Sequence, residues 1–355
     1  NGIIGLVDLT LKTELTEQQM QYQKKAAYSG QIMMNVINDI LDFSKIEAGK
    51  MDIESVDFNI NDIIENLIYS MSVRLDEKAL NFRIHTSDKV PMMLSGDPLR
   101  ISQILLNLCS NAIKFTDTGM VEVYFDYSQQ SNGTLLTEVK DTGIGMTPEH
   151  LDKVFDSFTQ ADGSTSRKFG GTGLGLTIVK QLTELMGGGI EVLSEQNVGS
   201  TVKVELQLPT TDSSNALQTI ESSNTFYYLP YGNVPYIQTD SFTALGLSPN
   251  IIDWSALEQL ANDNLGSATL LLDIPDMDYL TEHLTILSSA CEANVNIAFA
   301  TDIQPKNLSE QLYEHCKALT ISHPFSPSNL QKFFYSILRQ DNQEPEQLMQ
   351  VSTNE

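Results

Sequence analysis

Three short segments between residues 107 and 176 restrict most strongly what this chain can fold into. In order along the chain they read NLCSNAIKF, DTGIG and GGTGLGL. Segments rich in glycine or asparagine occur singly in many turns, so each alone is weak evidence. Together they supply amide oxygens, a carboxylate and unhindered backbone N–H groups, which are the groups that a nucleotide site requires.

The first segment lies on a predicted helix over residues 97–115. This helix begins with Asp-Pro, which suits an N-cap followed by a first helical residue without an N–H. Asn107, Asn111 and Lys114 recur at i, i+4 and i+7, so they share one face beside an apolar stripe. Amide oxygens are ligands for Mg²⁺, and a lysine ammonium binds phosphate. For this helix taken alone, a solvated polar face is the alternative.

The other two segments each follow or precede a predicted element. DTGIG follows a predicted strand over 135–140, and the carboxylate of Asp141 can accept a hydrogen bond from an adenine amino group. Gly143 and Gly145 leave room for a flat base against the backbone. GGTGLGL precedes a predicted helix over 177–186, so its N–H groups can form an anion site. The spacing fits neither a P-loop nor a dinucleotide-binding fold.

A long polar segment over residues 155–168, FDSFTQADGSTSRK, separates the two glycine-rich segments. Its length and composition suit a mobile lid over a nucleotide. Arg167 and Lys168 at its end could contact phosphate oxygens. For either residue alone, a solvated surface charge is an equal alternative.

These segments resemble the N, F and G boxes of sensor histidine kinases, and more narrowly the hybrid kinases of the BarA/GacS type. The resemblance covers residues 1–208 and includes NDILDFSKIEAGK and SRKFGGTGLGLTIVKQL. It implies a multidomain α and α/β protein with an ATP-binding sandwich shared with gyrase-, Hsp90- and MutL-type ATPases, and ATP and Mg²⁺ as cofactors.

The resemblance also implies roles for individual residues. By position, Asn111 would hold Mg²⁺, Asn107 and Lys114 would support catalysis, and Asp141 would bind adenine, with Thr201 behind it. The remaining residues expected to line the base and the phosphates are Gly143, Gly145, Arg167, Lys168, Gly171, Thr172, Gly173, Leu174 and Gly175.

Residues 1–50 have the pattern of a helical hairpin. Apolar residues within 18–46 recur at helical spacing, and two helices with one apolar face each cannot form a core alone. Pairing with a second copy would form a four-helix bundle, so we expect a homodimer. A hairpin packed on its own chain is the alternative. The family that the chain resembles uses such a bundle for dimerisation and phosphotransfer.

The family's phosphoacceptor histidine has no match in this sequence. Its His-Glu pair would lie upstream of the Asn-Gly that opens the chain, and the five histidines are His85, His150, His283, His315 and His323. We therefore expect a fragment of a longer protein that cannot phosphorylate itself. The expected partners are a response regulator and further receiver or phosphotransfer domains.

The composition restricts which partners the protein can bind and where in the cell it can lie. The net charge of −25 argues against nucleic acid and anionic membrane surfaces as partners, because both are polyanions. No apolar run reaches the ~20 residues that span a bilayer. The resemblance implies the cytoplasmic portion of a protein of the bacterial inner membrane.

A second α/β region is predicted beyond the ATP-binding domain of residues 51–209 and a polar linker over 210–223. Five short apolar runs alternate with helical patterns over 224–340, which predicts a flavodoxin-like, doubly wound parallel sheet. The region resembles a response-regulator receiver domain, with Asp273 in the place of the phosphorylated aspartate. The polar residues 341–355 would lead to a further domain.

We expect this receiver-like domain not to be phosphorylated. Its first predicted strand ends LPYGN, without the two acids that help a receiver to hold Mg²⁺, and His323 stands where a receiver has lysine. Asp273 alone cannot assemble an octahedral site. On this reasoning, replacing Asp273 by asparagine should leave stability nearly unchanged.

The favoured function is that of the ATP-binding and catalytic part of a hybrid histidine kinase, which transfers the γ-phosphoryl group to a histidine outside this chain. An ATP hydrolase or an ATP-dependent conformational switch on the same fold is the alternative. Hydrolysis requires a general base to activate water, and residue 107 carries an amide, which cannot accept a proton.

Overall fold

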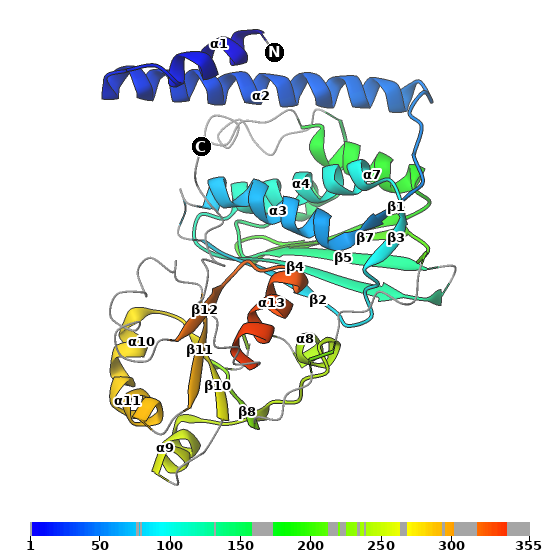
Figure 1. Ribbon diagram of the computed structural model, residues 1–355. Helices are drawn as coiled ribbons and strands as arrows, with labels where there is room; N and C mark the ends of the chain where they lie inside the picture. The colour runs from blue at the N-terminus through cyan, green and yellow to red at the C-terminus, as the bar shows by residue number, and fades with distance from the viewer. Residues whose placement is uncertain are drawn as a thin grey trace.

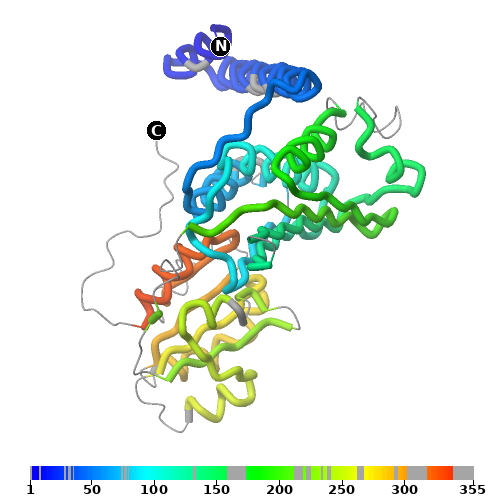
Figure 2. Tube along the Cα trace, turned by 90° about the vertical axis from the view of Figure 1, so that its right-hand side faces the viewer, coloured from blue at the N-terminus to red at the C-terminus, as the bar shows by residue number. Residues whose placement is uncertain are grey.

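The chain forms three parts in a computed structural model: a helical hairpin, an α/β sandwich and a second α/β unit (Figure 1). The view turned by 90° shows the sandwich between the other two parts (Figure 2). The structure describes residues 2–75, 78, 80–130, 133–157, 173–211, 219–220, 225–232, 235–237, 239–262, 268–292, 295–301 and 318–338. No helix within these ranges combines the length and the apolar composition needed to cross a bilayer.

The hairpin consists of α1 (Gly2–Leu11) and α2 (Glu17–Glu47), which confirms the predicted helices and the turn between them. Thr16 begins α2 with a capping box. Its hydroxyl accepts the Gln19 N–H at 3.3 Å, and the Gln19 side chain accepts the Thr16 N–H at 3.0 Å. The hairpin lies across the helical layer of the sandwich (Figure 1).

The sandwich is built on a five-stranded sheet in the order β2-β4-β5-β7-β6. β2 pairs parallel with β4, and the other pairs are antiparallel. Its strands are β2 (Leu80–Thr86), β4 (Gly119–Ser128), β5 (Thr134–Asp141), β6 (Gly189–Glu195) and β7 (Gly199–Gln207). The predicted strand before the DTGIG segment is therefore confirmed as β5.

Three helices cover one face of this sheet and enclose a single apolar core with it. They are α3 (Ile60–Leu75), α4 (Pro98–Phe115) and α7 (Gly175–Leu185). As predicted, Asp97 caps α4, because its carboxylate accepts the Arg100 N–H at 3.0 Å. Smaller elements at the periphery are the antiparallel pair β1 (Val56–Asn59) and β3 (Met93–Gly96), and the short helix α5 (Pro148–Leu151).

The second α/β unit has a parallel five-stranded sheet in the order β12-β11-β10-β8-β9. Numbered along the chain from β8, this order is 2-1-3-4-5, which occurs in doubly wound folds. Each of the five predicted apolar runs overlaps a strand. The strands are β8 (Thr225–Leu229), β9 (Asn250–Ile251), β10 (Ala268–Ile274), β11 (Asn296–Thr301) and β12 (Leu319–Ser322).

Helices cover both faces of this second sheet, and each face has its own core. One face packs against α8 (Thr239–Ala244) and α13 (Pro327–Leu338). The other packs against α9 (Trp254–Asn262), α10 (Met277–Glu282) and α11 (Leu284–Glu292). Because β10 lies between β11 and β8, it is buried on both sides, in accord with its continuous apolar run.

Candidate nucleotide site

Two amides of α4 face the beginning of α7. Asn107 and Asn111 are half-buried, and a Cβ added to Gly175 would lie 3.5 Å from Asn107 Oδ1 and 3.7 Å from Asn111 Nδ2. The residue before α7 is Leu174, whose side chain cannot accept the first helical N–H groups. These N–H groups and the positive end of the helix dipole can therefore bind an anion between the two helices.

Asp141 ends β5, and its carboxylate is half-buried. Its Oδ1 accepts the Gly143 N–H at 2.9 Å. Burial raises the pKa of Asp141, while the backbone N–H groups of Gly143 and Ser200 partly offset this rise. A Cβ on Gly143 would collide with the Phe115 carbonyl oxygen, so glycine is required where this turn packs under the end of α4.

A row of hydroxyl groups continues from Asp141 across β7 and β6. Ser200 lies opposite Asp141, and Ser194 lies opposite Ser200. The two serine oxygens are 2.9 Å apart, and the Met146 N–H donates to Ser194 Oγ at 2.8 Å. Residues directly opposite in a ladder share a face, so both hydroxyls lie on the same side of the sheet as Asp141.

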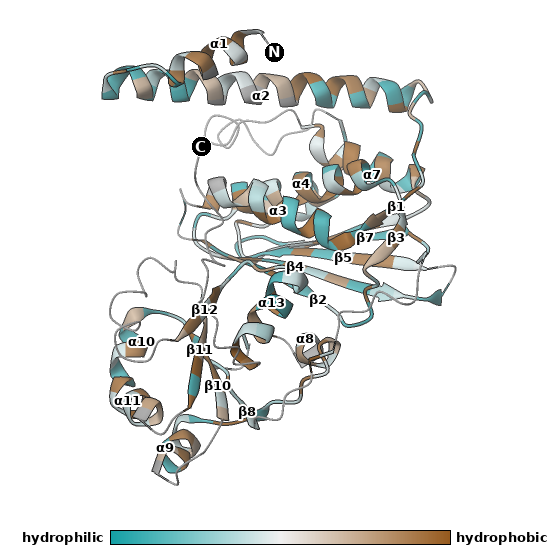
Figure 3. Cartoon of the chain, in the orientation of Figure 1, coloured by the Kyte–Doolittle hydropathy of each residue, from teal (hydrophilic) through white to brown (hydrophobic). Residues whose placement is uncertain are grey.

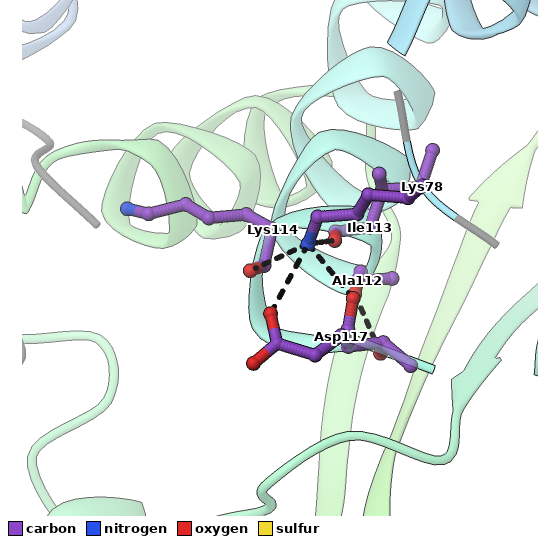
Figure 4. A network of polar contacts seen from close by, with 6 residues as sticks. Lys78, Ala112, Ile113, Lys114 and Asp117 are labelled. Carbon is purple, nitrogen blue, oxygen red and sulfur yellow. Dashed lines mark hydrogen bonds and ion pairs between the residues drawn. The ribbon is translucent and has the colours of Figure 1, made fainter. Parts of the chain in front are cut away.

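Lys78 closes the C-terminal end of α4, where backbone carbonyls lack helical partners. Its Nζ donates to three carbonyl oxygens, those of Ile113 at 2.6 Å, Thr116 at 2.8 Å and Lys114 at 3.3 Å. It also pairs with Asp117 at 3.7 Å (Figure 4). A cation at this end stabilises the helix dipole, so Lys78 supports the helix that carries the amides.

Lys114 follows the two amides on α4, and in Figure 4 its side chain extends away from the Lys78 cap. Its Nζ lies 4.7 Å from the centroid of the Phe115 ring. Burial lowers the pKa of Lys114, since desolvation disfavours the ammonium form. A phosphate group would offset this desolvation by pairing with the ammonium.

The hairpin is attached to the sandwich beside this site. Asp42 of α2 accepts Gln103 Nε2 of α4 at 2.8 Å and pairs with Arg100 at 3.6 Å. Further along, Gln181 Nε2 of α7 donates to Glu47 at 3.4 Å. The C-terminal part of α2 therefore lies over both helices that frame the amides.

In comparison with known proteins, the sandwich and the hairpin each match a separate protein-family model. Residues 96–210 match the histidine kinase-, DNA gyrase B- and HSP90-like ATPase family, and residues 1–49 match the His Kinase A (phospho-acceptor) domain. Residues 1–49 and 96–210 therefore match the two domains that histidine kinases combine. The family predicted from the motifs is thus confirmed, and the sandwich is its ATP-binding domain.

The relatives include hybrid kinases. Hybrid signal transduction histidine kinase B of Dictyostelium discoideum is 40% identical over 227 residues, or 63% of this chain and 12% of that protein. The kinase BarA of Escherichia coli K12 is 40% identical over 210 residues, and the sensor protein GacS of Pseudomonas syringae is 42% identical over 211. Each covers 59% of this chain and 23% of the relative. The chain therefore spans less than a quarter of these relatives.

One solved structure resembles nearly the whole chain. The crystal structure of full-length ShkA in complex with AMPPNP aligns with a TM-score of 0.70 at 24% identity. The alignment covers 97% of this chain and 69% of that one. It shows that the fold of this chain, including the second α/β unit, has a solved counterpart.

The candidate nucleotide site contains part of the predicted residue set. Asn107, Asn111 and Gly175 come together, while Asp141 lies at the end of β5 with Gly143 and Gly145 in the turn that follows it. Leu174 is fully buried in the core, so only its backbone can face a nucleotide. Most of the predicted lid lies outside the described residues. So do four of the predicted site residues, which are Arg167, Lys168, Gly171 and Thr172.

Ser200, rather than Thr201, is the hydroxyl residue beside Asp141. Thr201 lies opposite Lys140, and neighbouring residues of a strand point to opposite faces. The sequence did not single out Ser200 because a one-residue difference in register cannot be read from the pattern of β7. The row of hydroxyls with Ser194 was also missed, since it depends on pairing between three strands.

The chain has a second polar centre at Asp273, at the carboxyl end of β10. The Tyr228 hydroxyl donates to its carboxylate, with 2.9 Å to Oδ1 and 2.8 Å to Oδ2. The N–H groups of Tyr231 and Tyr236 donate to Oδ2 at 3.1 Å and 2.8 Å. Burial raises the pKa of Asp273 to about 6, although these hydrogen bonds and Arg83 favour the ionised form.

This arrangement corrects one expectation about Asp273. The side chain is fully buried and its two oxygens are already occupied by donors, so Asp273→Asn should lower stability instead of leaving it unchanged. Within the described ranges, no three side chains of His, Cys, Asp or Glu are placed to hold a metal ion.

Proposed function

We propose that this chain is the ATP-binding and phosphoryl-transferring part of a hybrid histidine kinase. The observation that carries this proposal is the convergence of Asn107 and Asn111 on the N-terminal end of α7, in a domain that also presents Asp141. The γ-phosphoryl group of ATP would pass to an imidazole nitrogen, with ADP as the leaving product. The first histidine in this sequence is His85, in β2, so the acceptor lies outside residues 1–84.

Each part of the nucleotide has a matching group in this proposal. The Asp141 carboxylate would accept a hydrogen bond from the adenine amino group. The N–H groups at the start of α7 and the Lys114 ammonium would hold the phosphates. The AMPPNP bound to ShkA supports a nucleotide as the ligand of this fold.

We further propose Asn111 as a ligand of Mg²⁺, with Asn107 beside it. Amide oxygens fit a hard cation that usually shares its coordination with substrate phosphates instead of an all-protein cage. When bound, the ion would neutralise charge on the phosphoryl oxygens.

Calorimetric titration with ATP, in Mg²⁺ and in EDTA, tests this site. Asn111→Ala should weaken binding about 5- to 150-fold in Mg²⁺ and much less in EDTA, because it removes a metal ligand. Asn81→Ala is the matched control, since Asn81 is exposed on β2 away from the site. Equal losses with and without Mg²⁺ would remove Asn111 from the metal site.

Phosphoryl transfer separates the kinase from the alternative ATP hydrolase. With γ-labelled ATP and a hairpin to which a His-Glu-bearing helix has been added, label should appear on the added hairpin in an acid-labile, base-stable form. The chain of residues 1–355 should not label itself. Release of free phosphate without labelled hairpin would instead support the hydrolase, although residue 107 is not a base.

The hairpin supports the proposal of a homodimer. Large apolar side chains on α1 and α2 are exposed, and Figure 3 colours parts of both helices as hydrophobic. Pairing with a second copy would remove this surface from water and complete a four-helix bundle. The exposed residues include Ile3, Leu6, Leu9, Met33, Ile37, Ile40 and Leu41.

We propose that the second α/β unit is a receiver-like domain, spanning 224–340, that does not accept phosphate. Its 2-1-3-4-5 strand order supports a receiver-like fold, and the occupied carboxylate of Asp273 argues against phosphorylation. Beryllofluoride should therefore produce no Mg²⁺-dependent change. A tight response abolished by Asp273→Asn would make the domain a working receiver.

By likeness to BarA and GacS, we propose that the whole protein is a sensor kinase acting with a response regulator. This chain would then be its cytoplasmic portion and the full-length protein would lie in the bacterial inner membrane. The proposed boundaries are 1–50 for the hairpin, 51–209 for the ATP-binding domain and 210–223 for the linker.

A further inference from the structure

The second α/β unit covers part of the outer face of the ATP-binding sheet. Along β2, Phe82 and Ile84 point into the apolar core, so Arg83 and His85 point to the face opposite the helices. Both are only 6% exposed, although α3, α4 and α7 lie on the other face of the sheet. The cover comes from the second unit, which lies against β2 in Figure 1.

Among the described residues, contacts at Arg83, His85 and Glu65 help to join the two parts. The guanidinium carbon of Arg83 lies 4.2 Å from the centroid of the Tyr236 ring. The rings of His85 and His323 are 6.4 Å apart between centroids. At the edge, Ser326 Oγ donates to Glu65 Oε1 of α3 at 3.1 Å.

The sandwich side of this contact is braced by its own polar network. His85 stacks on Tyr124 at 4.6 Å between ring centroids, and its Nε2 lies 3.4 Å from Glu122 Oε1. Burial raises the pKa of Glu122, but the neighbouring His85 and Tyr124 side chains and the charge of Lys140 outweigh it and lower the pKa overall. A carboxylate that is 4% exposed is thus kept ionised by its neighbours.

On the side of the second unit, a single residue connects three groups. The Tyr236 N–H donates to Asp273 Oδ2 at 2.8 Å, and its carbonyl accepts His323 Nε2 at 2.9 Å. Its ring meanwhile receives Arg83. The neighbouring Ile237 N–H donates to the Tyr228 hydroxyl at 3.2 Å, so Asp273 and Tyr228 together set the path of this loop.

We propose that Asp273, Tyr236 and His323 form an interdomain clamp that docks the second unit on β2 of the ATP-binding domain, with Asp273 as its positioning residue. Asp273, which stands in the place of a receiver's phosphorylated aspartate, here accepts a hydrogen bond from the Tyr236 N–H. The ring of Tyr236 in turn contacts the guanidinium of Arg83. This deepens the proposal made above for the receiver-like domain, and it is independent of ATP binding and of phosphoryl transfer.

The composition of the contact suits a clamp that can open. At the contacts named above, the sandwich contributes a guanidinium, an imidazole and a carboxylate, which water solvates well when the surfaces separate. Apolar side chains such as Ile60 and Phe325 lie beside them. Interfaces between domains of one chain are commonly polar for this reason and permit relative motion. A purely apolar contact would instead bind the two parts permanently.

Small-angle scattering and hydrogen exchange on the whole chain test the clamp. Asp273→Asn and Tyr236→Ala should each enlarge the radius of gyration and speed exchange of the amides of residues 236 and 237. Asp276→Asn is the matched control, because Asp276 caps α10 away from β2 and asparagine caps equally well. Wild-type scattering and exchange in both clamp variants would overturn the proposal.

Asp273→Asn and Tyr236→Ala alter the second unit itself and could misfold it. A variant of the sandwich side of the contact therefore provides a separate test. Arg83→Met removes the cation over Tyr236 and should speed exchange of the same two amides about 2- to 30-fold. In the double variant with Tyr236→Ala, the effect of Arg83→Met should vanish, since its partner ring is gone. Additive effects would contradict the clamp. Retained ATP binding in Arg83→Met would show that the nucleotide site does not depend on it.

Discussion

At the scale of single residues, Asp141 is the side chain on which base recognition depends. Asp141→Asn replaces one acceptor oxygen by a donor that faces the adenine amino group and leaves both groups unpaired. We expect ATP affinity to fall about 5- to 150-fold by calorimetry. Asp152→Asn is the control, because it makes the same change at an exposed aspartate, whereas Asp141 is half-buried. Unchanged affinity for ATP in Asp141→Asn would place the base elsewhere.

The neighbouring hydroxyls allow a sharper test of which strand residue serves the site. Ser200 shares a face with Asp141 and contacts Ser194, whereas Thr201 lies opposite Lys140. Ser200→Ala should lower ATP affinity about 2- to 12-fold, as expected for one hydrogen bond. Thr201→Ala should leave affinity unchanged. The reverse result would restore Thr201 to the place that the family resemblance assigns to it.

At the scale of elements, the C-terminal end of α4 depends on Lys78. Lys78→Met leaves three carbonyls without their cationic donor, and we expect the free energy of unfolding in urea to fall by about 1–3 kcal/mol. Lys89→Met is the control, because Lys89 is 67% exposed and its pair with Asp126 spans 3.9 Å. Such a surface pair contributes about 0–1 kcal/mol. Equal losses of unfolding free energy in Lys78→Met and Lys89→Met would show that the Lys78 cap contributes no more than a surface ion pair.

The apolar face of α2 is expected to mediate dimerisation. Ile37→Glu places a charge within this face and should shift sedimentation towards the monomer at micromolar concentration, because burial of the carboxylate is unfavourable. Asn38→Glu introduces the same charge about 100° around the helix, where it should have little effect. A dimer that survives Ile37→Glu would argue for a hairpin whose apolar face does not mediate pairing.

At the scale of the whole molecule, the clamp should be sensitive to pH through His323. Burial lowers the pKa of His323 well below 6.5, and the charges of Arg83 and His85 add to this, while the Tyr236 carbonyl and Glu122 oppose it. The folded chain therefore keeps His323 neutral below pH 6.5, where the unfolded chain takes up a proton. The contribution of neutral His323 to the free energy of unfolding is therefore fully present above pH 6.5. It is lost as the pH falls towards the lowered pKa of His323 in the folded chain.

Comparison with His323→Asn isolates this contribution. The pKa of Asp273, raised to about 6 mainly by burial, acts in the opposite direction between pH 6 and about 4, because the folded state then binds its proton more tightly. This term is common to both proteins and cancels in the difference. From pH 7.5 to 5.5, wild type should lose up to about 1.4 kcal/mol relative to His323→Asn. A constant difference would show that His323 titrates normally.

Sequence by itself determined the parts of this protein that depend on short-range order. Capping by Thr16 and Asp97, the face of α4 that carries two amides, and the five strands of the second unit all follow from residues close together in the chain. The motifs also identified the kinase family. Only the tertiary structure decided that Ser200 lies beside Asp141, that Lys78 caps α4 and that Asp273 supports an interdomain contact. These features join residues far apart in sequence, and strand register and domain docking leave no periodic pattern in the chain.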